Sequence, residues 1–110
     1  MAEFIKGDVV VIPFPFSDLS ATKRRPSLVI ATPKGNDIIT CQITSQFHND
    51  NYSIILENKD FECGTLNQMS YIRPNKLITI DKSIVLYKIG EIKKDFYNNV
   101  INKIIEIIKT

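Results

Sequence analysis

Residues 26–43, PSLVIATPKGNDIITCQI, contain two short runs of β-branched and apolar residues, 26–31 and 38–43, on either side of a turn. The six residues between the runs, TPKGND, are rich in turn formers, and this pattern is typical of a β-hairpin. Comparable runs occur at residues 8–14, 52–56, 68–72 and 77–80. This spacing predicts a small, strongly bent antiparallel sheet or a partly open barrel.

The last quarter of the chain changes to a helical period. Apolar residues recur at every fourth position from Ile92 to Ile108, and a second apolar row begins at Tyr97. This stripe predicts an amphipathic helix of about fifteen residues that packs on the sheet. Lys93 stands where a capping Ser or Thr is expected, so the sequence predicts a weak start to this helix.

Length and composition narrow the class of protein. A chain of 110 residues predicts one compact domain, residues 1–110, and a net charge of only +2 does not indicate a polybasic nucleic-acid protein. A single histidine, His48, and two cysteines without paired spacing argue against a metal site or a cofactor. Since no apolar run has the length of a signal peptide or a membrane span, we expect a cytoplasmic protein without a membrane partner.

Three consecutive cations, Lys23, Arg24 and Arg25, directly precede Pro26. The residue before a proline favours extended geometry, so we expect Arg25 to be held on the sheet. A cation fixed on a rigid element beside a loop is suited to bind phosphate. The alternative is a solvated charge cluster that keeps a strand end soluble.

Two further polar segments lie near the ends of predicted strands. Thr44, Ser45 and Gln46 follow residues 38–43, and their hydroxyl and amide groups can bond phosphate oxygens or a base edge. The same groups can equally satisfy the backbone of a turn. Arg73 precedes a proline and forms a second Arg-Pro step near a strand end.

In this order, the segments resemble the PemK/MazF family of toxin endoribonucleases from bacterial type II toxin–antitoxin modules, and within it a PemK-like branch. The resemblance begins at residues 6–12, KGDVVVI, and is strongest at residues 23–30, KRRPSLVI, which are similar to the family signature Arg-Pro-x-Leu-Val. It continues through ITS at 43–45, SYIR at 70–73 and LITID at 77–81, and it ends in the C-terminal helix. The resemblance covers nearly the whole chain.

The resemblance implies a mainly β fold with α structure: a small SH3-like β-barrel of the CcdB/MazF type, with a C-terminal amphipathic helix packed on it. It implies a cytoplasmic homodimer with a cognate antitoxin as partner. The implied activity is that of an mRNA interferase, a metal-independent and sequence-selective endoribonuclease that needs no cofactor. Such an enzyme cleaves single-stranded RNA by attack of the 2′-OH and leaves 2′,3′-cyclic phosphate and 5′-OH ends.

The resemblance assigns catalysis to two residues. Arg25 would stabilise the transition-state charge on the scissile phosphate, and Thr44 would orient the same phosphate. The expected RNA-binding residues are Asp18, Lys23, Arg24, Ser45, Gln46 and Arg73. Because arginine is charged at every relevant pH, Arg25 is a poor general base. That role is left to His48, to Asp18 or to neither.

The chain departs from the family pattern in two places. Its first loop, FPFSDLSAT at residues 14–22, lacks the glycines of many members, so no recognised RNA sequence is inferred. Asn75 stands where some relatives have an acid, and an amide cannot act as an acid or a base. Two alternatives to the nuclease remain: a non-catalytic toxin that acts on DNA gyrase through protein contacts, and a degenerate member that only binds RNA or an antitoxin.

Overall fold

The computed structural model describes residues 3–15 and 22–110, and these residues form seven strands, one α-helix and two short 3-10 helices. The strands are β1 (Asp8–Pro15), β2 (Thr22–Ala31), β3 (Asp37–Thr44), β4 (Ile54–Leu56), β5 (Phe61–Cys63), β6 (Ser70–Asp81) and β7 (Tyr87–Ile92). The helices are η1 (Asn58–Asp60), η2 (Lys82–Ile84) and α1 (Lys94–Ile108). Within these described ranges, no helix combines the length and the apolar character needed to cross a membrane.

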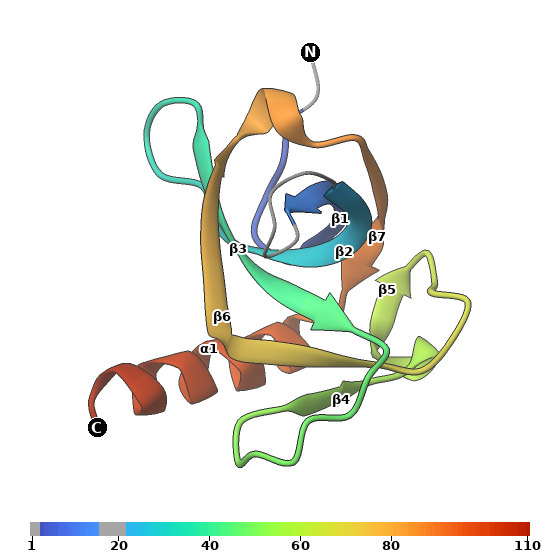
Figure 1. The fold of residues 1–110 in the computed structure, drawn as a ribbon, viewed down its shortest axis with the longest axis vertical. Coiled ribbons are helices and arrows are strands. Elements are labelled where there is room, and N and C mark those ends of the chain that lie inside the picture. Colours follow the sequence, from blue (N-terminus) through green and yellow to red (C-terminus); the bar gives the residue numbers. More distant parts are fainter. Residues whose placement is uncertain (1–2, 16–21) are drawn as a thin grey trace.

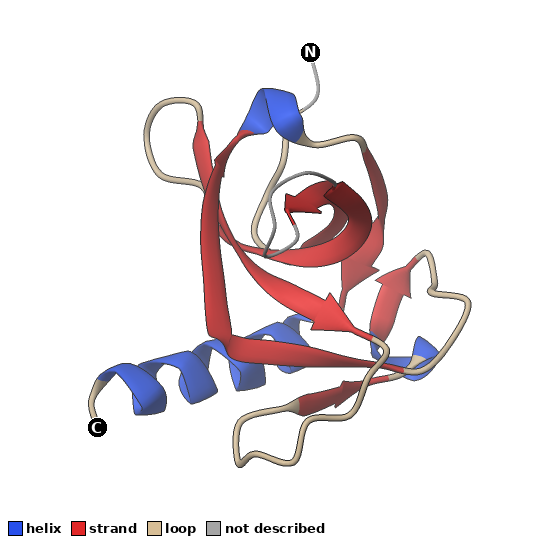
Figure 2. Ribbon diagram, in the orientation of Figure 1, coloured by secondary structure: helices blue, strands red, loops and turns tan. Residues whose placement is uncertain are grey.

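All seven strands belong to one sheet, in the order β4-β6-β3-β2-β1-β7-β5, and every neighbouring pair is antiparallel. The sheet curls on itself, and α1 crosses one side of it near β6 (Figures 1 and 2). The prediction of a strongly bent antiparallel sheet with a C-terminal helix is therefore confirmed.

Strand β6 differs from the sequence prediction, which placed separate strands at residues 68–72 and 77–80. The structure has one continuous strand, and its register with β3 shifts in the middle, where Cys41 pairs with Leu77 and Gln42 with Arg73. Residues 74–76 of β6 are therefore extra to the ladder and form a bulge. Pro74 fits this position because a bulged residue need not donate a ladder hydrogen bond. The prediction of two strands here is wrong.

Apolar side chains are buried on both faces of the sheet, since neighbouring residues such as Val9 and Val10 point to opposite sides. The larger cluster lies on the side of α1 and consists of Val9, Leu28, Ile30, Cys41, Ile43, Leu56, Phe61, Ile72, Ile92, Phe96, Val100 and Ile104. The smaller cluster consists of Val10, Ile12, Val29 and Ile38. Burial on two faces explains why residues 9–12 of β1 and 28–30 of β2 are continuously apolar rather than alternating.

Helix α1 packs on the sheet through the stripe that its sequence predicts, because Phe96, Val100 and Ile104 are its buried residues. A hydrogen bond also joins the two layers: Tyr97 Oη donates to the carbonyl oxygen of Ile30 at 2.5 Å. The pKa of the Tyr97 phenol is raised, mainly because the group is partly buried. At the N-terminus of the helix, Lys93 makes no capping side-chain bond, as predicted.

Strand β7 is joined to β1 by a buried charge. Asp8, at the start of β1, is fully buried, and its Oδ1 lies 3.2 Å from Nζ of Lys88 on β7. Its Oδ2 accepts a hydrogen bond from the backbone N–H of Ile5 at 3.0 Å. Lys88 also bonds Glu91 at 3.0 Å, and this bond, followed by Asp8, raises the pKa of the lysine. Asp8, which opens β1, therefore has a structural role.

Candidate functional site

The three consecutive cations lie on β2 itself, ahead of Pro26. Lys23 and Arg24 are exposed, whereas Arg25 is half-buried and pairs with Ile12 of β1. The sheet therefore holds Arg25 in place, as its position before a proline predicts.

Strands β3 and β6 place four further side chains together. In their ladder Gln42 pairs with Arg73, and Thr44 pairs with Tyr71. Side chains two residues apart on a strand share a face, and directly paired residues do so as well. All four side chains therefore lie on the same face of the sheet.

Strand β2 adds Arg25 to this face. Ser27 pairs with Gln42, and Arg25 stands two residues before Ser27, so it lies on the same side. The same step along β3 leads from Gln42 to Thr44. Arg25, Gln42, Thr44, Tyr71 and Arg73, which we call the polar face, are therefore brought together from three adjacent strands.

Thr44 is nearly buried, with 6% of its surface exposed, at the end of β3. Its Oγ1 accepts a hydrogen bond from the backbone N–H of Gln46 at 3.1 Å, which stabilises the turn that follows the strand. A hydroxyl that accepts in this way still has its own proton to donate. Ser45 and Gln46 follow on this turn, and both are exposed.

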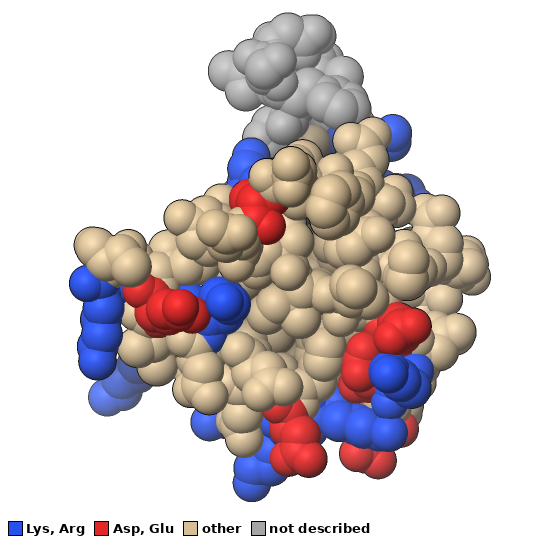
Figure 3. Space-filling view, turned by 90° about the horizontal axis from the view of Figure 1, so that it is seen from below, with Lys and Arg blue, Asp and Glu red and all other residues tan. Residues whose placement is uncertain are grey.

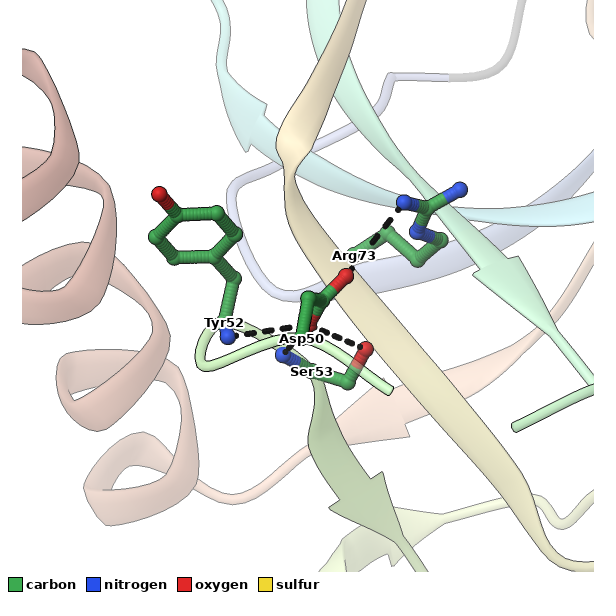
Figure 4. Close-up of polar contacts among 4 residues, drawn as sticks. All are labelled: Asp50, Tyr52, Ser53 and Arg73. Atoms are coloured by element: carbon green, nitrogen blue, oxygen red, sulfur yellow. Dashed lines mark hydrogen bonds and ion pairs between the residues drawn. The ribbon is translucent and has the colours of Figure 1, made fainter. Parts of the chain in front are cut away.

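The guanidinium group of Arg73 is nearly buried, with 14% of the side chain exposed. Its Nη2 forms a long ion pair with Oδ2 of Asp50 at 3.5 Å (Figure 4). Among the residues that the structure describes, its buried Nε has no hydrogen-bond partner, and neither has the buried Oε1 of Gln42. Arg73 thus retains an unsatisfied buried donor on the polar face, and its positive charge suits an anionic ligand.

Asp50 organises the loop between β3 and β4. Its Oδ1 accepts hydrogen bonds from the backbone N–H of Tyr52 at 2.9 Å, and from the N–H and Oγ of Ser53 at 3.0 and 3.1 Å (Figure 4). These bonds, that from Tyr52 first, lower the pKa of the Asp50 carboxyl. They also explain why β4 begins only at Ile54, two residues after the predicted start.

We expect Asp50→Asn to lower the thermal midpoint of unfolding at neutral pH. Because the carboxyl of the folded protein has a lowered pKa, its stabilising effect is complete above the unfolded value of about 3.8 and is lost as the pH falls through the folded value. The difference between wild type and variant should therefore shrink below about pH 4. Thermal unfolding from pH 7 to 3 tests this, with Asp37→Asn, an exposed carboxylate at the start of β3, as control. A difference that is constant over this range would contradict it.

A pocket of about 240 Å³ opens where β2 begins, β3 ends and β6 begins. Its lining residues are Arg24, Arg25, Pro26, Ile43, Ser45, Leu66, Asn67, Gln68 and Ser70. The pocket brings together three residues predicted from the sequence, Arg24, Arg25 and Ser45, while Thr44 and Arg73 are not among its lining. Asn67 and Gln68 were missed, although two consecutive amides just before the SYIR segment are a signal that could have identified them.

Of the two candidates for the general base, the structure describes His48 but not Asp18. His48 is half-buried on the loop after Thr44, and its carbonyl oxygen accepts a hydrogen bond from the Asp50 N–H at 2.8 Å. Asp18 lies outside the described residues. Asn75, the position of a possible family acid, is exposed in the bulge of β6.

Two further observations concern thiol chemistry and metal binding in the described part of the chain. Burial raises the pKa of the Cys41 thiol to about 12, so the thiol stays protonated at neutral pH. In residues 3–15 and 22–110, no group of three or more His, Cys, Asp or Glu side chains is arranged to hold a metal ion. On the face viewed in Figure 3, positive and negative side chains are interspersed around a broad uncharged area.

Comparisons with known proteins give a family and a fold. A family model described as "PemK-like, MazF-like toxin of type II toxin-antitoxin system" matches residues 5–108. A search of curated proteins finds no match.

Three solved structures are similar to this chain along almost its whole length. A mycobacterial endoribonuclease in complex with its cognate antitoxin has a TM-score of 0.78 at 12% identity, over 97% of this chain and 96% of the other. A MazE–MazF structure from Deinococcus radiodurans has a TM-score of 0.76 at 18% identity, over 97% of each chain. The Mycobacterium tuberculosis toxin MazF-mt6 has a TM-score of 0.72 at 17% identity, over 93% of this chain and 96% of the other. These similarities confirm the expected MazF-like fold.

Proposed function

Because the chain belongs to the family of PemK-like, MazF-like toxins of type II toxin–antitoxin systems, we propose that it is an endoribonuclease that cleaves single-stranded RNA without a metal ion. The observation that carries this proposal is the polar face, where Arg25 and Arg73 share one side of the sheet with Thr44. Two guanidinium groups and a hydroxyl from adjacent strands suit a phosphodiester group.

The chemistry requires alignment and charge stabilisation more than any added reagent. The 2′-oxygen of a ribose attacks its own 3′-phosphate, and the bond to the 5′-oxygen of the next nucleotide breaks. The 2′-OH gives up its proton to a base, and the leaving 5′-oxygen takes up a proton. The products are a 2′,3′-cyclic phosphate and a 5′-OH end. Arg25 donates hydrogen bonds to the non-bridging oxygens of the phosphate as their negative charge grows. Thr44 donates a hydrogen bond from its hydroxyl group and so keeps the phosphate in line for attack.

We propose that the pocket beside Arg25 holds a nucleotide next to the cleaved bond. The amides of Asn67 and Gln68 and the hydroxyl of Ser45 can bond the edges of an unpaired base, which supports a sequence-selective enzyme. Lys23, Arg24 and Gln46 are exposed and are proposed to contact the RNA backbone. Asp18, the remaining predicted contact, lies outside the described residues.

We propose His48 as the general base because it is close to Thr44 in the sequence, and not because of a contact between the two side chains. His48 lies four residues after Thr44, and histidine is the side chain that most often serves as a general base. Asp18 stays a prediction from the sequence.

A cognate antitoxin and a second copy of the chain are the proposed protein partners. The mycobacterial endoribonuclease of similar fold was solved with its cognate antitoxin, and the family match is to toxins of toxin–antitoxin systems. An acidic, flexible antitoxin segment would complement the cations of β2 and would compete with RNA.

The proposal is tested by incubating the purified protein with a mixed single-stranded RNA in the presence of EDTA. We expect cleavage at a limited set of sites, with 2′,3′-cyclic phosphate and 5′-OH ends identified by mass spectrometry. The same RNA with 2′-O-methyl groups, which cannot attack the phosphate, should stay intact. RNA that remains intact in both forms would contradict the proposal, and stalling of DNA gyrase in a parallel assay would instead support a gyrase-directed toxin.

A further inference from the structure

Phe47 is an exposed aromatic residue in the loop between β3 and β4. Its relative exposure is 66%, among the highest of the large apolar residues in the described chain. The ring is not isolated, because it meets the ring of Tyr71 edge to face, with centroids 5.7 Å apart and planes at 66°. Such a pair is a favourable aromatic arrangement, and it leaves much of the Phe47 ring open to solvent.

The aromatic pair borders the polar face. Tyr71 pairs with Thr44 across the β3/β6 ladder, and Arg73 follows it by two residues on the same side of the sheet. Phe47 comes three residues after Thr44. The flat ring surface therefore adjoins the groups to which the phosphate is assigned.

The loop that carries Phe47 is tied to the sheet at both ends. On one side, Thr44 Oγ1 holds the N–H of Gln46. On the other side, Asp50 holds the N–H groups of Tyr52 and Ser53 and pairs with Arg73 on β6. These bonds fix the loop before any ligand binds, so little conformational entropy is lost when a ligand contacts the ring.

We propose that Phe47 and Tyr71 form a stacking platform for an unpaired nucleobase of the RNA, next to the phosphate held by Arg25 and Arg73. This inference rests on the proposed function and adds a base-binding site to it. Aromatic rings beside guanidinium groups are the usual means by which proteins hold single-stranded nucleic acid, since every base has a face that stacks. Because stacking is tolerant of sequence, the platform supplies affinity, while the amides of the neighbouring pocket supply selectivity.

The absence of tryptophan from the sequence makes a direct optical test possible. In Phe47→Trp the new indole is the sole tryptophan, and stacking on a base should quench its fluorescence. The probes are a mixed-sequence single-stranded DNA decanucleotide, which has no 2′-OH and cannot be cleaved by this chemistry, and the same backbone without bases. We expect quenching by the first probe and not by the second. Tyr87→Trp, at a 52% exposed position on β7, is the matched control and should not respond.

Binding and kinetics give an independent readout. Phe47→Ala should weaken binding of the decanucleotide by about 5- to 150-fold, the range for loss of one stacked base, and leave binding of the abasic probe unchanged. With RNA, KM should rise while kcat is largely retained, and Phe47→Trp should restore binding. Because the Phe47 ring is mostly exposed, the thermal midpoint of Phe47→Ala should match that of the wild type.

Three outcomes would overturn the platform. The decanucleotide could fail to bind, or Phe47→Ala could weaken the binding of both probes equally. The fluorescence of Phe47→Trp could also respond in the same way to the probes with and without bases. The last result would leave the exposed ring to a protein partner. Failure here is distinguishable from failure of the proposed function. If the wild type cleaves RNA and Phe47→Ala binds and cleaves as the wild type does, only the platform is contradicted. If bases quench the fluorescence of Phe47→Trp but the wild type cleaves no RNA, only the nuclease activity is contradicted.

Discussion

Replacement of Arg25 by alanine is expected to lower the rate of RNA cleavage by about 100- to 1,000-fold, the usual cost of removing one preorganised donor from a developing oxyanion. The side chain is half-buried on the polar face and outside both apolar clusters, so the fold should persist. Single-turnover cleavage at saturating protein isolates the chemical step from binding. Circular dichroism and the thermal midpoint of unfolding check that the variant is folded.

Two matched variants separate the chemistry of this guanidinium from its charge. Arg25→Lys keeps the positive charge but loses the planar fork of donors, so its rate should stay well below the wild-type rate. Arg24→Ala removes the same charge from the exposed neighbouring position, and we expect weaker, less salt-dependent RNA binding with a smaller change in the chemical step. Equal losses for Arg24→Ala and Arg25→Ala would show that only the net charge of β2 matters.

The parts of the fold that the sequence predicts are those whose side chains repeat with a clear period. The stripe of α1 identified Phe96, Val100 and Ile104, which are buried, whereas Ile108 at the end of the stripe is 69% exposed. The apolar runs likewise located β1 and β3 to within about one residue at each end. In these segments, local pattern and tertiary burial agree.

The missed strands depend on pairing with distant residues. Strand β7, YKIGEI, has no regular alternation, and it exists because β1 pairs with it across a shifted register between Val9 and Val10. Strand β5 has three residues and, among the described strands, pairs with β7 alone. The continuity of β6 through Pro74 depends on a bulge opposite Cys41 and Gln42. None of these registers can be derived from local composition.

The candidate site divides in the same way. Arg25 and Thr44 were identified from short segments, but their position on one face follows only from the register of β2, β3 and β6. The contact of Phe47 with Tyr71 joins residues far apart in the sequence, and no local pattern predicts it. Residue types are visible in the sequence, whereas their arrangement around a ligand requires the sheet.

Two glycines allow the backbones of β5 and β7 to approach closely. A Cβ added to Gly90 would lie 2.3 Å from the carbonyl oxygen of Cys63 and 2.9 Å from the Cα of Gly64. A Cβ added to Gly64 would lie 2.3 Å from the carbonyl oxygen of Ile89. These neighbours are backbone atoms, so no side chain can rotate away to make room.

Gly90→Ala is therefore expected to separate β5 from β7 and to expose Phe61, which is 7% exposed in the folded protein. Loss of this burial predicts a destabilisation of about 2–3 kcal/mol and a thermal midpoint lower by roughly 10 °C or more. Urea unfolding measures the free energy, and hydrogen exchange should show faster exchange in β5. Gly35→Ala is the control: its φ is +105°, and nothing lies within 4 Å of an added Cβ. Added backbone strain should destabilise it by only about 1 kcal/mol, and equal destabilisation of the two variants would show that steric contact with β5 is not the cause.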